Sequence, residues 1–202
     1  MQVGELKKIE KELSAFVEDF APELGRAERR YWCKLYVTGL LLDGERKSIE
    51  PMAQRVPGGN EQALQQFVNQ SPWAHEPVQK KLSRRLVRGS GPGKGVLVLD
   101  DTTLPKKGEA SVGVARQYCG ALGKVANCQA IVTWHYCGPR AHFPLLGEVY
   151  LPQAWVTDSA KLDRAGVPDD KRVFREKWKL AVELLDRVSE ELSYEALVMD
   201  AG

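Results

Sequence analysis

The sequence predicts an α+β fold in two domains, a helical domain over residues 1–90 and a mixed sheet with a helix crossover over residues 91–202. Three observations predict it. Apolar residues recur at helical spacing up to residue 88, a glycine-rich segment follows at residues 89–95, and short apolar runs typical of strands come after it. The length of 202 residues exceeds the usual single-domain size of about 100–150 residues, which agrees with two domains.

The composition is that of a globular protein, with 43% hydrophobic and 28% charged residues. No run of about 20 apolar residues occurs, and the first residues are charged rather than a basic segment followed by an apolar one. The four cysteines include no C-x-x-C pair, which argues against a zinc ribbon or finger. Membrane insertion, secretion and structural zinc binding are therefore disfavoured.

Five helices are expected before the glycine-rich segment. The first ends near Pro22, because the apolar residues before it follow a period of 3.6 and a proline interrupts that pattern. The second covers about residues 27–42 and stops at an Asp-Gly pair. Two short helices follow, one starting near Ser48 and one over residues 61–69, separated by Gly-Gly-Asn. The fifth covers about residues 75–88.

The expected fifth helix is strongly basic on one side. Its apolar residues Val78, Leu82 and Leu86 are spaced to face inward. The residues expected to project outward and contact DNA are Lys80, Lys81, Arg84, Arg85 and Arg88. Short helices followed by a basic helix are what a helix-turn-helix module needs, namely a positioning helix and a helix that enters a groove. A generic helical bundle with a charged surface explains the same pattern.

Strand-like runs follow the glycine-rich segment. That segment invites comparison with a phosphate-binding loop, but it precedes an apolar run instead of opening a helix, so we interpret it as a linker. The expected strands cover residues 96–99, 111–118, 125–136 and 141–151. The first of these strands ends in Asp100 and Asp101.

A long amphipathic helix over about residues 171–192 and a last strand over residues 196–199 are expected next. The apolar stripe expected on that helix consists of Phe174, Trp178, Ala181, Val182, Leu185 and Val188. A right-handed crossover through this helix brings the last strand parallel to strand 96–99 in one sheet. This order predicts a ribonuclease H-like arrangement, in which those two strands are neighbours.

Carboxylates lie at the ends of the two strands that are expected to be neighbours. Asp101 (or Asp100) ends one strand, and Asp200 ends the other. Hard oxygen ligands suit Mg²⁺ or Mn²⁺, and two such ions stabilise the attacking and leaving oxygens in phosphodiester cleavage. We therefore expect Asp101 and Asp200 to be catalytic metal ligands, supported by Asp100 and Thr102. Taken alone, each aspartate can also be interpreted as a turn former or helix cap.

The positive charge of the chain is concentrated in its middle. The net charge is only +2, but residues 80–125 carry ten basic against three acidic residues. Beyond the basic helix, the residues expected to contact DNA are Lys106, Lys107, Arg116 and Lys124. Basic residues around an Asp-Asp pair are expected where polyanion binding and carboxylate chemistry meet. A solvated charged face is the alternative.

Four segments resemble one family of proteins. Residues 98–108 (VLDDTTLPKKG) and 111–129 (SVGVARQYCGALGKVANCQ) resemble the insertion-sequence transposases of the DDE superfamily, and most closely the insertion-sequence family numbered seven hundred and one. Residues 39–53 (GLLLDGERKSIEPMA) and 58–68 (GGNEQALQQFV) match that family as well. The resemblance extends from about Glu28 to the last residue.

The resemblance implies a DNA transposase that uses Mg²⁺ or Mn²⁺ to cleave DNA strands and transfer them. The family's first catalytic aspartate lies in a D-D-T motif and its second in a D-A-G-Y-G motif, which correspond to Asp101 and Asp200 here. The implied partner is double-stranded DNA with terminal inverted repeats, bound by a dimer. The implied location is cytoplasmic and nucleoid-associated.

The family's third acidic residue, a glutamate on a later helix, has no counterpart before Gly202. The resemblance therefore implies an N-terminal portion with two of three carboxylates and an incomplete ribonuclease H-like domain, which is expected to be inactive alone and prone to aggregate. A non-catalytic DNA-binding fragment that acts on element ends or on intact transposase is the alternative. An ordinary ribonuclease H-like nuclease is a third interpretation.

Overall fold

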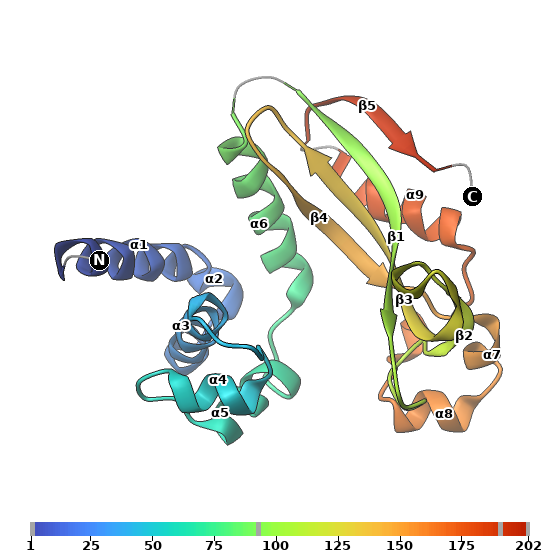
Figure 1. Cartoon of the computed structure of the whole chain (residues 1–202), viewed down its shortest axis with the longest axis horizontal. Helices are drawn as coiled ribbons and strands as arrows, with labels where there is room; N and C mark the ends of the chain where they lie inside the picture. The colour runs from blue at the N-terminus through green and yellow to red at the C-terminus, as the bar shows by residue number, and fades with distance from the viewer. Residues whose placement is uncertain (1–2, 92–93, 190–191, 201–202) are drawn as a thin grey trace. The chain divides into compact units, whose positions relative to one another are not determined.

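The computed structural model describes residues 3–91, 94–189 and 192–200. Pro92 and Gly93 of the expected linker, residues 190–191 of the expected long helix, and residues 201–202 lie outside the described residues. The chain divides into two compact units, Met1–Lys81 and Leu82–Gly202. The division falls inside helix α6 (His75–Gly89), and Figure 1 gives the order of the elements.

The first unit is built from helices. Before α6, the described helices are α1 (Val3–Asp19), α2 (Ala21–Leu24), α3 (Ala27–Leu41), α4 (Ile49–Arg55) and α5 (Glu61–Asn69). The first expected helix stops at Asp19, because Pro22 lies in the first turn of α2, where its missing N–H costs no helical hydrogen bond. The expected bounds of α5 are confirmed.

The turn between α4 and α5 fixes the packing of the first unit. Asn60 caps α5, since its side-chain oxygen accepts a hydrogen bond from the backbone N–H of Ala63 at 2.9 Å. At Gly59, a Cβ atom would lie 2.1 Å from the carbonyl oxygen of Ala53, so only glycine allows this close approach. The buried cluster that these helices share consists of Leu35, Ala53, Val56 and Leu64.

A five-stranded mixed sheet forms the centre of the second unit (Figure 1). Its strands are β1 (Gly95–Pro105), β2 (Ala115–Cys119), β3 (Lys124–Cys137), β4 (His142–Val149) and β5 (Tyr194–Met199). The strand order is β2-β3-β1-β5, and β4 also pairs with β3. β3 is antiparallel to its partners, whereas β5 runs parallel to β1.

Strand β1 is longer than expected, and Asp100 and Asp101 lie inside it rather than at its exit. The reason is β3, a strand of 14 residues whose residues 128–137 pair with β1 as far as Pro105. Asp100 is the partner of Thr133, and Asp101 is the partner of Val132. The two aspartates are therefore held by ladder hydrogen bonds and point to opposite faces of the sheet.

Helix α9 (Lys177–Ser189) supplies the crossover before β5, and its expected apolar stripe is confirmed at Ala181 and Leu185, which lie against the core, but is wrong at Trp178 and Val182. The helix begins at Lys177 rather than near Lys171, and the side chains of Trp178 and Val182 are exposed. The buried residues are Leu180, Ala181 and Leu184, which pack with Leu97, Val132, Trp134 and Tyr136 of the sheet. The apolar residues of α9 are spaced so that either of two faces of the helix could be buried. Which face is buried depends on how the helix packs against the sheet. The side chain of Val188 lies outside the described ones.

Short elements complete the second unit. The 3₁₀ helix η1 (Gly120–Leu122) joins β2 to β3, and α7 (Gln153–Val156), α8 (Ser159–Arg164) and η2 (Asp169–Lys171) lie between β4 and α9. The buried indole of Trp155 donates to the carbonyl oxygen of Val114 at 2.7 Å and thereby ties α7 to the segment before β2. Among the helices of the described ranges, none is long and apolar enough to cross a membrane.

Two variants of α9 test which of its faces is buried. Leu184→Ala removes a side chain with 1% exposure, so unfolding free energy is expected to fall by about 2–5 kcal/mol. Val182→Ala, at 50% exposure on the same helix, is expected to change it by less than about 0.5 kcal/mol. Denaturant unfolding followed by circular dichroism measures both, and an equal loss in the two variants would contradict this packing.

Candidate metal and nucleic-acid site

The parallel pairing of β1 and β5 brings the two predicted metal-binding segments side by side. In their register Leu97 is opposite Leu197 and Leu99 is opposite Met199. Extending this register by one residue on each strand would put Asp200 opposite Asp100. With strands about 4.8 Å apart and a rise of about 3.3 Å per residue, the Cα atoms of Asp101 and Asp200 are expected about 6 Å apart.

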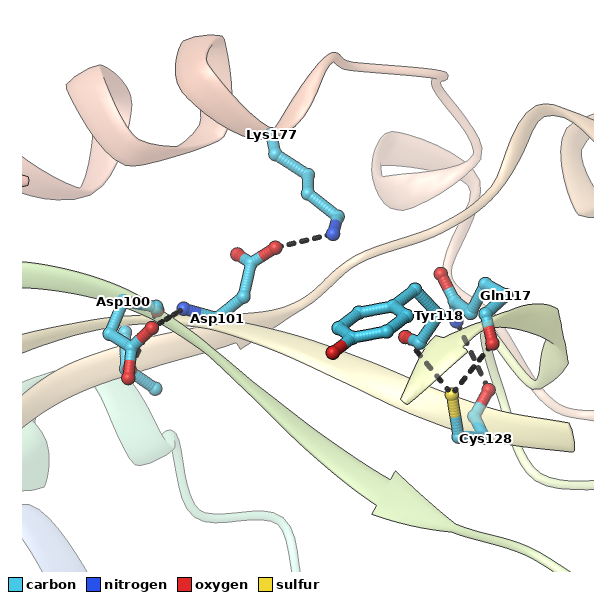
Figure 2. Close-up of polar contacts among 7 residues, drawn as sticks. Asp100, Asp101, Gln117, Tyr118, Cys128 and Lys177 are labelled. Carbon is cyan, nitrogen blue, oxygen red and sulfur yellow. Dashed lines mark hydrogen bonds and ion pairs between the residues drawn. The ribbon is translucent and has the colours of Figure 1, made fainter. Parts of the chain in front are cut away.

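Asp100 and Asp101 have different surroundings on the two faces of β1. Asp101 shares its face with Leu97, which packs against α9. Asp100 lies on the other face, where its carboxylate accepts a hydrogen bond from the backbone N–H of Asp101 at 2.8 Å (Figure 2). The carbonyl oxygen of Asp100 accepts another from the hydroxyl of Thr133 at 3.0 Å. Asp100 therefore fixes the backbone that carries Asp101.

Asp200 is exposed and follows the last paired residue of β5. Strand alternation by itself assigns it to the face of Asp100. Beyond Met199, however, the ladder hydrogen bonds no longer fix the direction of a side chain. That Asp200 shares an ion with Asp101 rather than with Asp100 stays a prediction.

A cation already lies against the carboxylate of Asp101. The ammonium of Lys177, the first residue of α9, forms an ion pair with Oδ2 of Asp101 (Figure 2). Nζ of Lys177 also lies 5.4 Å from the centre of the Tyr150 ring. Sequence reasoning missed Lys177, because its role depends on where α9 begins and on which face of β1 the helix covers.

The donor set at this place fits a hard divalent cation. Asp101 and Asp200 offer carboxylate oxygens, and the ammonium at Asp101 occupies a place where a positive charge is stabilised. Within the described residues, no group of three or more histidine, cysteine, aspartate or glutamate side chains could hold a metal ion. Asp101 and Asp200 as the two metal ligands stay a prediction.

Cys33 and Cys128 are poor candidates for soft metal ligands. All four are free thiols, and burial raises the pKa of Cys33 to about 11. Burial also raises the pKa of the Cys128 thiol, which lies 3.8 Å from the carbonyl oxygen of Tyr118 (Figure 2). Both thiols are consequently protonated at neutral pH, whereas a metal ligand would have to be a thiolate.

The two threonines that follow Asp101 have different positions. Thr102 is exposed on β1, opposite Ile131, and strand alternation puts it on the face of Asp100. The hydroxyl of Thr103 accepts a hydrogen bond from the backbone N–H of Ala121 at 3.3 Å and so ties β1 to η1. A supporting position of Thr102 beside Asp101 stays a prediction.

The basic residues expected on α6 are not all alike. Lys80, Arg84, Arg85 and Arg88 are exposed. Lys81 instead lies within the first unit, where its ammonium is 3.5 Å from a carboxylate oxygen of Asp19 and 3.3 Å from one of Glu23. It also lies 5.4 Å from the centre of the Phe20 ring. The Lys81 side chain, 27% exposed, is therefore half-buried against α1 and α2 rather than projecting outward, and its contact with DNA stays a prediction.

The other predicted basic residues belong to the same unit as Asp101. Arg116 on β2, Lys124 at the start of β3 and Lys107 after β1 are exposed, and Lys106 is half-buried. The side-chain amide of Asn127 donates to the carbonyl oxygens of Lys106 and Gly108, both at 3.0 Å. These bonds hold the backbone that carries Lys106 and Lys107 against β3.

Comparison with known proteins identifies the class. Residues 19–202 match the family described as DDE superfamily endonuclease, and the chain belongs to that family. Membership implies a ribonuclease H-like fold, and enzymes of the family generally use a divalent metal.

A named relative agrees with this class. The chain is 37% identical over 118 residues to a protein of Microchaete diplosiphon called "Probable transposase for insertion sequence element IS701". The match covers 57% of this chain and 30% of the relative, so it spans less than a third of that protein's length. The predicted kinship to insertion-sequence transposases is confirmed.

The contrast between Lys81 and its neighbours on α6 gives a test of DNA contact. Replacing both Arg84 and Arg85 by alanine is expected to weaken binding to duplex DNA and to reduce the slope of log affinity against log salt, since each phosphate contact adds about 0.9 to that slope. Lys81→Ala is the matched control and is expected to leave the slope unchanged, because the Lys81 side chain is only 27% exposed whereas Arg84 and Arg85 are exposed. If Lys81→Ala reduces the slope and the double arginine variant does not, the assignment of DNA contact to Arg84 and Arg85 would be wrong.

Proposed function

We propose that this chain is the part of a DNA transposase that binds the ends of its element and contributes two carboxylates to metal-dependent strand cleavage and transfer. The observation that carries the proposal is the parallel pairing of β1 and β5, which makes neighbours of the two strands that bear Asp101 and Asp200. Membership in the DDE superfamily endonucleases supplies the class of reaction.

Asp101, inside β1, and Asp200, directly after β5, are proposed to hold Mg²⁺ or Mn²⁺ together. A bound divalent metal lowers the pKa of a water or a DNA 3′-hydroxyl and neutralises charge that develops on the phosphate. Asp101 presents its carboxylate from the α9 face of β1, and Asp100 steadies it through the hydrogen bond to its backbone N–H. No protein nucleophile is required for this reaction.

The basic residues are proposed to bind the DNA backbone. Arg84, Arg85 and Arg88 on α6 are exposed, as are Lys107, Arg116 and Lys124 near the sheet. Phosphate contacts of this kind position the duplex and carry no sequence information, so recognition of terminal inverted repeats by the helical unit is a separate part of the proposal. A dimer on DNA would hold the two ends together.

A second candidate function has an observation in its favour. Within the described residues no group of three or more histidine, cysteine, aspartate or glutamate side chains could hold a metal ion, whereas a two-metal reaction commonly uses a third acidic ligand. Two carboxylates fit a DNA-binding role without cleavage, exerted on element ends or on intact transposase. Metal-dependent cutting by this chain alone would exclude the second candidate.

Three aspartate variants test the proposed metal ligands. In a transposase that contains this chain, Asp101→Asn and Asp200→Asn are each expected to lower Mg²⁺-dependent cleavage of element ends by more than about a hundredfold, since each removes a charged ligand of the metal. Binding to the same DNA is expected to stay within about twofold of the wild type, because no basic contact is lost.

Asp100→Asn is the matched control for the adjacent position. Asparagine keeps an oxygen that can accept the N–H of Asp101, so a loss of less than about tenfold is expected. A larger loss in Asp100→Asn than in Asp101→Asn would assign the metal to the other face of β1.

A further inference from the structure

The ion pair between Lys177 and Asp101 joins the first residue of α9 to the middle of β1 (Figure 2). The side chains are 41% and 37% exposed, so the pair is open to solvent and to ions. Exposed pairs of this kind are weak, and a divalent cation competes effectively for the same carboxylate oxygens. The ion pair therefore orients the Asp101 carboxylate but does not prevent a divalent cation from binding it.

The position of Lys177 on its helix is electrostatically unfavourable without an acidic partner. A helix N-terminus carries a partial positive charge, which repels a cation and attracts an anion. The next lysine, Lys179, pairs with Glu176 at 2.8 Å and lies 5.3 Å from the ring centre of Trp178. Lys177 in contrast turns to the sheet, where the Asp101 carboxylate and the face of the Tyr150 ring receive it.

We infer that Lys177 is a positioning residue of the metal site, whose ammonium is the counter-ion of Asp101 until a divalent cation displaces it. The inference rests on the proposed function, because it takes Asp101 to be a metal ligand. While paired with Asp101, the ammonium also lies 5.4 Å from the centre of the Tyr150 ring, whose face offers it a second favourable contact. The consequence is a site that binds divalent cations less tightly than it would without Lys177, since the resident ammonium must first leave Asp101.

The inference predicts that removing the ammonium tightens metal binding. In a titration of the 202-residue chain with Mn²⁺, followed by electron paramagnetic resonance of the free ion, Lys177→Met is expected to lower the dissociation constant about three- to tenfold, as an exposed charge pair is lost and a nearby repulsion removed. Lys177→Arg keeps a cation and is expected to restore the wild-type affinity. Lys179→Met is the matched control two residues away and is expected to stay within about twofold of the wild type.

The variant Asp101→Asn separates failure of the inference from failure of the proposed function. If Asp101→Asn leaves the Mn²⁺ affinity unchanged, Asp101 is not a metal ligand. Both the proposed function of Asp101 and the inference on Lys177 would then be wrong. If Asp101→Asn weakens Mn²⁺ binding but Lys177→Met does not tighten it, only the inference on Lys177 would be wrong. Binding that is equally undetectable in the wild type and in Lys177→Met would overturn it as well.

A second measurement uses the unaltered chain and does not depend on the folding of a variant. Acetylation of lysines, mapped by mass spectrometry, reports how accessible each ammonium is. Addition of Mn²⁺ is expected to speed the modification of Lys177 at least about twofold relative to Lys179, because the ion takes the carboxylate that shields Lys177. Equal rates for Lys177 with and without Mn²⁺, under conditions where the ion binds, would contradict displacement.

Discussion

The parallel pairing of β1 with β5 is the constraint on which the proposed chemistry depends. The two strands are far apart in the chain, and parallel neighbours need a crossover, which α9 provides. The crossover holds because Leu180, Ala181 and Leu184 bury against the sheet, and because the indole of Trp134 donates to the carbonyl oxygen of Ala181 at 2.8 Å. Loss of that packing would separate Asp101 from Asp200 without changing either residue.

Two adjacent aspartates have different roles because a strand turns them to opposite faces. Asp101 faces α9 and a cation, whereas Asp100 accepts a hydrogen bond from the backbone N–H of its neighbour. The same helix therefore buries the apolar part of the sheet and brings Lys177 to Asp101. Core packing and the charge environment of the metal site are consequences of one docking geometry.

The sequence predicts the bounds of a capped helix and the order of the strands better than it predicts contacts between individual side chains. The bounds of α5 are fixed by a cap at Asn60, and the crossover order of the strands leads to the β1 and β5 pairing. The buried stripe of α9 and the pairing of Lys81 with Asp19 depend on partners distant in the chain, which periodicity cannot identify. Lys177 is missed for the same reason, since nothing local distinguishes it from Lys179.

The most direct test is the position of a metal ion in crystals soaked with Mn²⁺, measured by anomalous diffraction. The account predicts a peak about 2.0–2.6 Å from carboxylate oxygens of both Asp101 and Asp200, with Nζ of Lys177 moved away from Asp101. A peak held by Asp100 on the opposite face of β1, or carboxylates of Asp101 and Asp200 that share no ion at saturating Mn²⁺, would contradict it.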